Sequence, residues 1–66
     1  MNLLLNGEPQ DIPSGLTVAA FLDRLGLPQT GIAVERNREI VPKSVYSVTV
    51  LTDGDRIEIV QFVGGG

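Results

Sequence analysis

One stretch of the chain has the apolar spacing of a helix, whereas the other apolar stretches are short and have strand character. The apolar residues of this stretch fall at positions i, i+3, i+4 and i+7, and they are Val18, Phe21, Leu22 and Leu25. Thr17 is predicted as the N-cap, and Gly26 is predicted to end the helix. A helix of roughly two to three turns is too short to be stable alone. Its apolar stripe must therefore pack against a sheet built by the rest of the chain.

The segment before the helix predicts a β-hairpin. Asn6-Gly7 is the strongest two-residue hairpin signal, and it follows an apolar run at residues 3–5. The return strand is predicted over residues 8–12, and Pro9 limits that strand to an edge of the sheet. The chain is therefore expected to open with two antiparallel strands.

A second β region is predicted after the helix, starting at Ile32, turning at Asn37-Arg38 and returning at Ile40. If this turn is of type I′, Arg38 needs a positive φ, which costs free energy for a residue with a Cβ. Residues 43–47 predict one helical turn, and a last strand follows from Arg56 with Ile57 and Ile59 pointing inward. Beyond Ile59 the alternation of apolar and polar residues breaks.

The order of these elements is two strands, a helix, and further strands with a short extra turn, which predicts an α+β roll. We expect a mixed sheet of four to five strands packed on one helix, with the last strand beside the first. This is the β-grasp arrangement of ubiquitin. Residues 1–63 are expected to form this domain, and residues 64–66 to form a flexible glycine tail.

The composition excludes several classes of function. Five scattered basic residues, eight acidic residues and a net charge of −3 argue against nucleic acid as a partner. The chain has no His and no Cys, so the usual general base and the commonest metal ligands are missing. Asp53 and Asp55 lie close together, but we expect turn chemistry from them rather than catalysis. We therefore expect no bound cofactor or metal and no enzyme activity by the chain alone.

The start of the sequence lacks the basic and apolar regions of a signal peptide, and no apolar run is long enough to cross a membrane. We expect a cytoplasmic protein that binds no membrane.

The end of the sequence draws attention because strand-like residues are followed by Gly64, Gly65 and Gly66. A tail without side chains can extend into a narrow channel, and a carboxylate at its end becomes an acyl donor once an enzyme activates it. The alternative interpretation of the three glycines is a frayed terminus or a cloning remnant. Composition alone does not decide between the two.

The sequence resembles the ThiS family, the ubiquitin-like sulfur carriers of thiamine biosynthesis, over essentially its whole length. The stretches that carry the resemblance are Asn6-Gly7-Glu8, Thr17-Val18, residues 33–37, residues 40–44, residues 53–60 and the terminal glycines. The chain departs from the family pattern at Lys43, where Arg is more common, and at Arg38, where Gly is frequent. Neither departure affects the glycines, although Lys43 is a candidate contact with a partner.

The resemblance implies a function for Gly66. A ThiF-type enzyme would use ATP to adenylate its carboxylate, and sulfur from a cysteine desulfurase, delivered directly or through a persulfide relay, would displace AMP. The resulting thiocarboxylate would donate sulfur to a ThiG-type thiazole synthase. The small subunit of molybdopterin synthase is the nearest alternative, and a ubiquitin-like modifier or a non-covalent adaptor is an alternative from another class.

Val60 and Phe62 lie just before the glycines and are predicted on the strand face that carries Arg56 and Glu58. One interpretation is that they form an exposed docking surface for the activating enzyme. The other is that a bulge or a covering loop buries Phe62 in the core. The sequence leaves both open.

Overall fold

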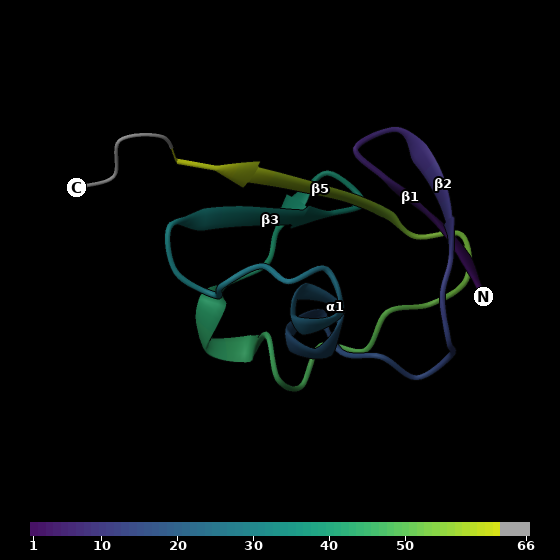
Figure 1. Ribbon diagram of the computed structural model, residues 1–66, viewed down its shortest axis with the longest axis horizontal. Coiled ribbons are helices and arrows are strands. Elements are labelled where there is room, and N and C mark those ends of the chain that lie inside the picture. Colours follow the sequence, from purple (N-terminus) through teal and green to yellow (C-terminus); the bar gives the residue numbers. More distant parts are fainter. Residues whose placement is uncertain (63–66) are drawn as a thin grey trace.

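The computed structural model describes residues 1–62 and shows two layers, a five-stranded sheet and one α-helix packed across one face of it (Figure 1). The strands are β1 (Asn2–Leu5), β2 (Glu8–Asp11), β3 (Ile32–Arg36), β4 (Glu39–Ile40) and β5 (Arg56–Gln61). Their order across the sheet is β2-β1-β5-β3-β4. The predicted α+β class and the mixed sheet on one helix are confirmed.

The last strand, β5, lies between the two hairpins and joins them. It runs parallel to β1 and antiparallel to β3, so the expected neighbourhood of the first and last strands is confirmed. The first hairpin turns at Asn6 and Gly7, whose φ angles of 50° and 83° are those of a type I′ turn. Pro9 lies in β2, which is an edge strand of the sheet as predicted. Its missing N–H therefore costs no hydrogen bond between strands.

The helix α1 (Val18–Arg24) begins where the sequence predicts. The hydroxyl of Thr17 caps it by accepting a hydrogen bond of 3.1 Å from the amide of Ala20. The placement of Leu25 in the core stripe is wrong, because the helix has only seven residues and Leu25 is its C-cap, with 36% of its surface exposed. Gly26 then takes a φ of 74°, the left-handed conformation that ends the helix.

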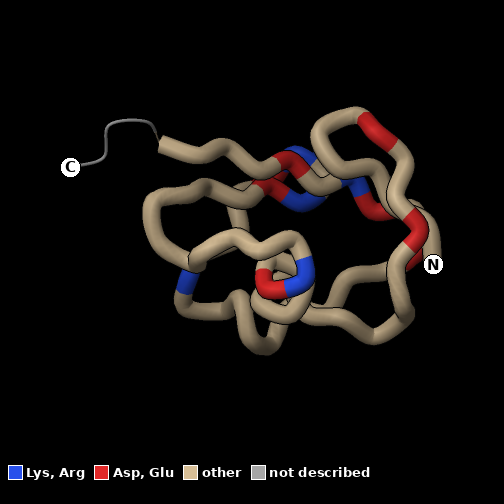
Figure 2. The backbone as a smooth tube through the Cα atoms, viewed as in Figure 1, with Lys and Arg blue, Asp and Glu red and all other residues tan. Residues whose placement is uncertain are grey.

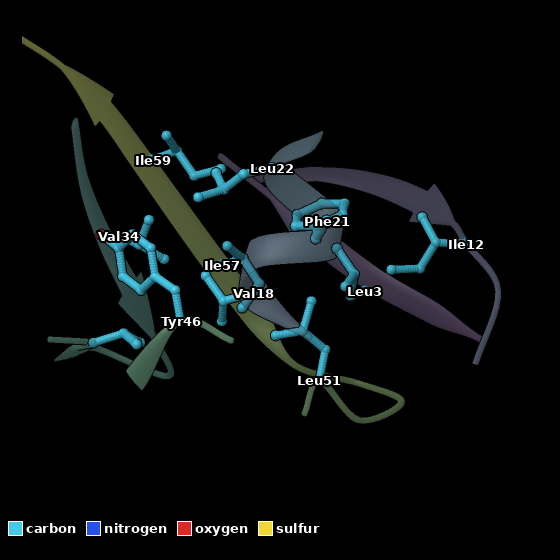
Figure 3. Packing of buried hydrophobic residues seen from close by; sticks show 11 residues of the cluster. Leu3, Ile12, Val18, Phe21, Leu22, Val34, Tyr46, Leu51, Ile57 and Ile59 are labelled. Carbon is cyan, nitrogen blue, oxygen red and sulfur yellow. The ribbon is translucent and has the colours of Figure 1, made fainter. Parts of the chain in front are cut away.

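The hydrophobic core lies between α1 and the inner face of the sheet (Figure 3). From the helix, Val18, Phe21 and Leu22 are fully buried, and they form one core cluster with Ile57 of β5 and Val34 of β3. Tyr46 and Leu51, from the segment that leads into β5, close the core on one side. Because Ile57 and Ile59 point inward, the intervening residues of β5 must face away from the helix.

The segment between β4 and β5 lies on the helix side of the sheet (Figure 1). It begins with the short 3-10 helix η1 (Lys43–Val45), so the predicted helical turn is confirmed. The amides of Val18 and Ala19 donate hydrogen bonds of 2.9 Å to the carbonyl oxygens of Thr49 and Tyr46, which ties this segment to the start of α1. None of the helices in the described part of the chain is long and apolar enough to cross a membrane.

Candidate functional site

The end of β5 presents apolar side chains away from the helix. Val60 is 55% exposed and Phe62 is 60% exposed, whereas Ile57 and Ile59 are buried on the opposite face. The amide of Phe62 still donates a hydrogen bond of 2.9 Å to the carbonyl oxygen of Gly31, so pairing with the β3 side continues to this residue. The interpretation that a bulge or a loop buries Phe62 is therefore wrong. A docking role for the two side chains stays a prediction.

The side chain of Asn6 holds β5 where strand β1 has ended. Its Oδ1 accepts a hydrogen bond of 2.8 Å from the amide of Ile59, and its Nδ2 donates one of 3.3 Å to the carbonyl oxygen of the same residue. These two bonds replace the pair that a further residue of β1 would supply. As a result, β5 is held on both sides as far as Ile59.

Asp55 forms a second restraint, at the start of β5. Its carboxylate accepts hydrogen bonds of 2.8 Å from Arg36 Nε and from the amide of Thr52, 3.0 Å from the hydroxyl of Thr52, and 3.1 Å from Asn37 Nδ2. Asp55 is 5% exposed. The predicted turn chemistry of this residue is confirmed, and it also joins the turn before β5 to the β3–β4 hairpin.

These contacts determine the charge of Asp55. Burial by itself raises the pKa of the carboxyl, but the hydrogen bonds from Thr52, Asn37 and Arg36 lower it and prevail. The pKa of Asp55 therefore lies below its ordinary value of 3.8, and the carboxylate is ionised at neutral pH. Its neighbour Asp53 serves the same turn, since Oδ1 of Asp53 accepts a hydrogen bond of 2.7 Å from the amide of Asn2.

The β3–β4 turn has the positive φ angles that were expected to cost free energy at Arg38. Asn37 and Arg38 have φ angles of 52° and 70°, so Arg38 adopts the left-handed conformation without being a glycine. The backbone amide of Asn37 donates to the carbonyl oxygen of Arg56 at 2.7 Å, and Asn37 Oδ1 accepts from the amide of Arg56 at 2.9 Å. Asn37 thus binds the backbone of Arg56 at the start of β5, as Asn6 binds the backbone of Ile59 nearer the end of the strand.

The predicted site residues do not all come together. Lys43 is exposed on η1, on the helix side of the sheet, whereas Val60 and Phe62 are on the outer face (Figure 1). Gly64, Gly65 and Gly66 lie outside the described residues. Sequence reasoning missed Ile40, which is 65% exposed and lies opposite Glu35 in the register of β3 and β4. The signal was the two-residue turn at Asn37-Arg38, which sets this register.

The described residues offer little for catalysis. Within residues 1–62, no group of three or more acidic, His or Cys side chains is arranged to hold a metal ion. A surface depression among these residues lies beside β4 and η1, and its lining residues include Val41 and Val45. What the geometry does provide is a last strand that is hydrogen-bonded on both sides and has exposed apolar side chains at its end.

Comparisons with known proteins agree on one family. The model of the ThiS family matches residues 3–66. The sulfur carrier protein ThiS of Escherichia coli is 33% identical over 66 residues, which is the whole of both chains. A crystal structure of the thiamine biosynthesis protein ThiS from Geobacter metallireducens superposes with a TM-score of 0.86 at 35% identity, again over both whole chains.

A longer relative also matches the whole chain. The thiazole synthase of Paramagnetospirillum magneticum is 50% identical over 66 residues, but the chain spans only 20% of that protein. The thiazole synthase of Magnetococcus marinus is 42% identical over 66 residues, and the chain again spans 20% of that protein. The chain therefore corresponds to about a fifth of the length of these two relatives.

Proposed function

Because this chain belongs to the ThiS family, we propose that it is a sulfur carrier protein of thiamine biosynthesis. The observation that carries the proposal is the match to a sulfur carrier protein over the whole length of both chains. The fold supports it, since β5 is held at Arg56 and at Ile59 and is the last strand before the glycines in the sequence. The confirmed family makes the sequence-based interpretation of Gly66 the leading hypothesis.

The proposed chemistry takes place at the carboxylate of Gly66, which must be free. A ThiF-type enzyme transfers the adenylyl group of ATP to this carboxylate and releases pyrophosphate. The terminal sulfur of a persulfide then attacks the acyl carbon and AMP leaves, which gives an acyl disulfide. A second thiol attacks the sulfur of the donor in this bond, so that a disulfide forms between the two thiols and the thiocarboxylate is released. The persulfide comes from a cysteine desulfurase, directly or through a relay. Gly64 and Gly65 are proposed to extend into the active site of the partner.

A ThiG-type thiazole synthase is proposed to receive the sulfur. Two proteins named thiazole synthase contain a region similar to this whole chain, which supports a functional association between the two activities. In this proposal the chain is a protein co-substrate, with no catalysis of its own and no bound cofactor, and it works in the cytoplasm. Val60 and Phe62 are proposed to dock on the activating enzyme. Lys43 is a separate contact, because it lies on the helix side of the sheet.

The mass of the intact protein tests this proposal. The chain is incubated with ATP, an adenylating enzyme, a cysteine desulfurase and cysteine, and its mass should increase by the difference between one sulfur and one oxygen atom. A variant without Gly66 should show no increase. A mass increase that survives this deletion would contradict the proposal, and an amide bond to a lysine would favour a ubiquitin-like modifier. Rescue of a thiamine auxotroph, and not of a molybdenum-cofactor mutant, separates the two sulfur carriers.

A further inference from the structure

Two acidic residues lie directly opposite each other on the outer face of the sheet. Glu35 of β3 and Glu58 of β5 are partners in the antiparallel register, and acidic stretches of the two strands lie side by side in Figure 2. Side chains of such partners start within about 5 Å of each other, and like charges at this spacing destabilise a sheet. The repulsion between the two carboxylates does not stabilise the sheet, so their placement calls for another explanation.

No Lys or Arg in residues 1–62 forms an ion pair with either carboxylate. Among residues 1–62 the ion pairs join the N-terminus to Asp11 and Arg36 to Asp55. Arg36 is adjacent to Glu35 in sequence, but its guanidinium contacts Asp55 and Thr52. Arg56 lies two residues before Glu58 on the same exposed face of β5 and forms no ion pair within these residues. Glu35 and Glu58 are therefore available to a positive charge from outside.

Apolar side chains lie beside the two carboxylates on the same face, on the side of Glu58 away from Arg56 and across from Glu35 on β4. Ile40 lies opposite Glu35 on β4 and is 65% exposed. Val60 follows Glu58 along β5, next to Ala33, and Phe62 lies beyond Val60. Residues that face each other across neighbouring strands point to the same side of the sheet. The result is one surface, called here the acidic-apolar face, formed by Ala33, Glu35, Ile40, Glu58, Val60 and Phe62.

We propose that the acidic-apolar face binds the adenylating enzyme through an apolar enzyme surface that carries an arginine or lysine side chain at its centre. The charge fits, because a guanidinium can span two neighbouring carboxylates and is held by charge-assisted hydrogen bonds. The position also fits, because the face ends at Phe62, immediately before the residues that lead to Gly66. Bound in this way, the enzyme removes the repulsion between Glu35 and Glu58. This inference rests on the proposed function.

Reversing one of the two charges tests the inference. Glu58→Lys places a cation opposite Glu35, so the melting temperature should stay the same or rise while binding to the adenylating enzyme weakens. Glu58→Gln should raise the Kd about tenfold, the scale of one charge-assisted hydrogen bond. Glu8→Lys and Glu8→Gln are the matched controls, since Glu8 is exposed on the edge strand β2 and opposite Leu5. Binding is measured by calorimetric titration of the whole chain with the enzyme.

The outcomes separate this inference from the proposed function. If Glu58→Lys and Glu8→Lys weaken binding equally, only the net charge matters and the acidic-apolar face is refuted. In that case the wild-type chain still binds and acquires sulfur. If the wild-type chain neither binds the enzyme nor gains mass with ATP and the sulfur source, the proposed function fails and this inference fails with it. Weaker binding together with a lower melting temperature in Glu58→Gln would also refute it, because that result indicates a structural role.

Discussion

Replacing Asp55 by Asn changes one oxygen into an amide group and removes a negative charge at a buried position. The four hydrogen bonds to the Asp55 carboxylate come from Arg36, Asn37 and Thr52, and each oxygen accepts two of them. An Asn side chain has one oxygen, so it can replace only one of the two carboxylate oxygens as an acceptor. If it faces Arg36 and the amide of Thr52, its own NH₂ group meets Asn37 Nδ2, and neither can accept the hydrogen bond of the other.

The magnitude follows from these contacts. Hydrogen bonds to charged groups contribute about 1.5–3 kcal/mol each, and a buried donor left without a partner costs a similar amount. With Arg36 left donating to a neutral amide oxygen and the bond from Asn37 lost, we expect the free energy of unfolding to fall by about 2–4 kcal/mol. A chain of this length has about 3–10 kcal/mol of stability in total. The melting temperature should therefore drop by about 10–30 °C.

Urea unfolding of Asp55→Asn and the wild-type chain over a pH series checks this prediction. The folded-state pKa of Asp55 is lowered, so the carboxylate stabilises the protein above its ordinary pKa of 3.8. This contribution is lost as the pH falls through the lower folded-state pKa. The difference between wild type and Asp55→Asn should be constant near neutral pH and narrow below 3.8.

Asp53→Asn is the matched control, because Asp53 is exposed and its side chain accepts one hydrogen bond that an Asn oxygen can also accept. It should cost less than about 1 kcal/mol. If Asp55→Asn costs no more than this control at neutral pH, Asp55 does not join the β3–β4 hairpin to the turn before β5 in the way described above.

Three further substitutions probe the strands and turns around β5. Arg38→Gly should raise the free energy of unfolding by about 1 kcal/mol in urea, because glycine adopts the φ of 70° without steric cost; no gain would mean that Arg38 makes a compensating contact. Asn6→Gly keeps the turn but removes both bonds to Ile59, so hydrogen exchange of the Ile59 amide should accelerate while that of Val34 changes less; equal acceleration would indicate global destabilisation instead. Phe62→Ala should weaken binding to the activating enzyme and change stability by less than about 0.5 kcal/mol, since Phe62 is exposed; a large loss of stability with unchanged binding would assign it to the core.

Much of the fold follows from local signals in the sequence. Asn6-Gly7, the apolar spacing from Val18 to Leu22 and the alternation around Ile57 and Ile59 each correspond to an element of the structure. Leu25 was misplaced because the 3.6-residue pattern continues past the point where Gly26 ends the helix. A periodic pattern predicts which face of a helix a residue would lie on. The C-cap decides whether the helix extends as far as that residue.

The acidic-apolar face is harder to predict because it depends on pairing between strands distant in sequence. Nothing local places Glu35 opposite Glu58, since Glu35 belongs to the β3–β4 hairpin and Glu58 to the last strand, and the two meet only in the register of β3 and β5. A shift of that register by one residue would turn every side chain of β5 to the other face. The sequence thus shows that Val60 and Phe62 share a face with Glu58, but not what lies beside them.

The two hairpin turns explain how that register is held. Asn6 and Asn37 each take the first position of a turn, with φ angles of 50° and 52°, and each binds the backbone of β5 through its side-chain amide. Asn37 holds Arg56 at the start of the strand, and Asn6 holds Ile59 nearer its end. Glycine would satisfy the left-handed backbone at either turn but would leave these bonds unmade. Asparagine therefore serves the turn and the central strand at once, and it keeps the outer face of β5 directed away from the helix.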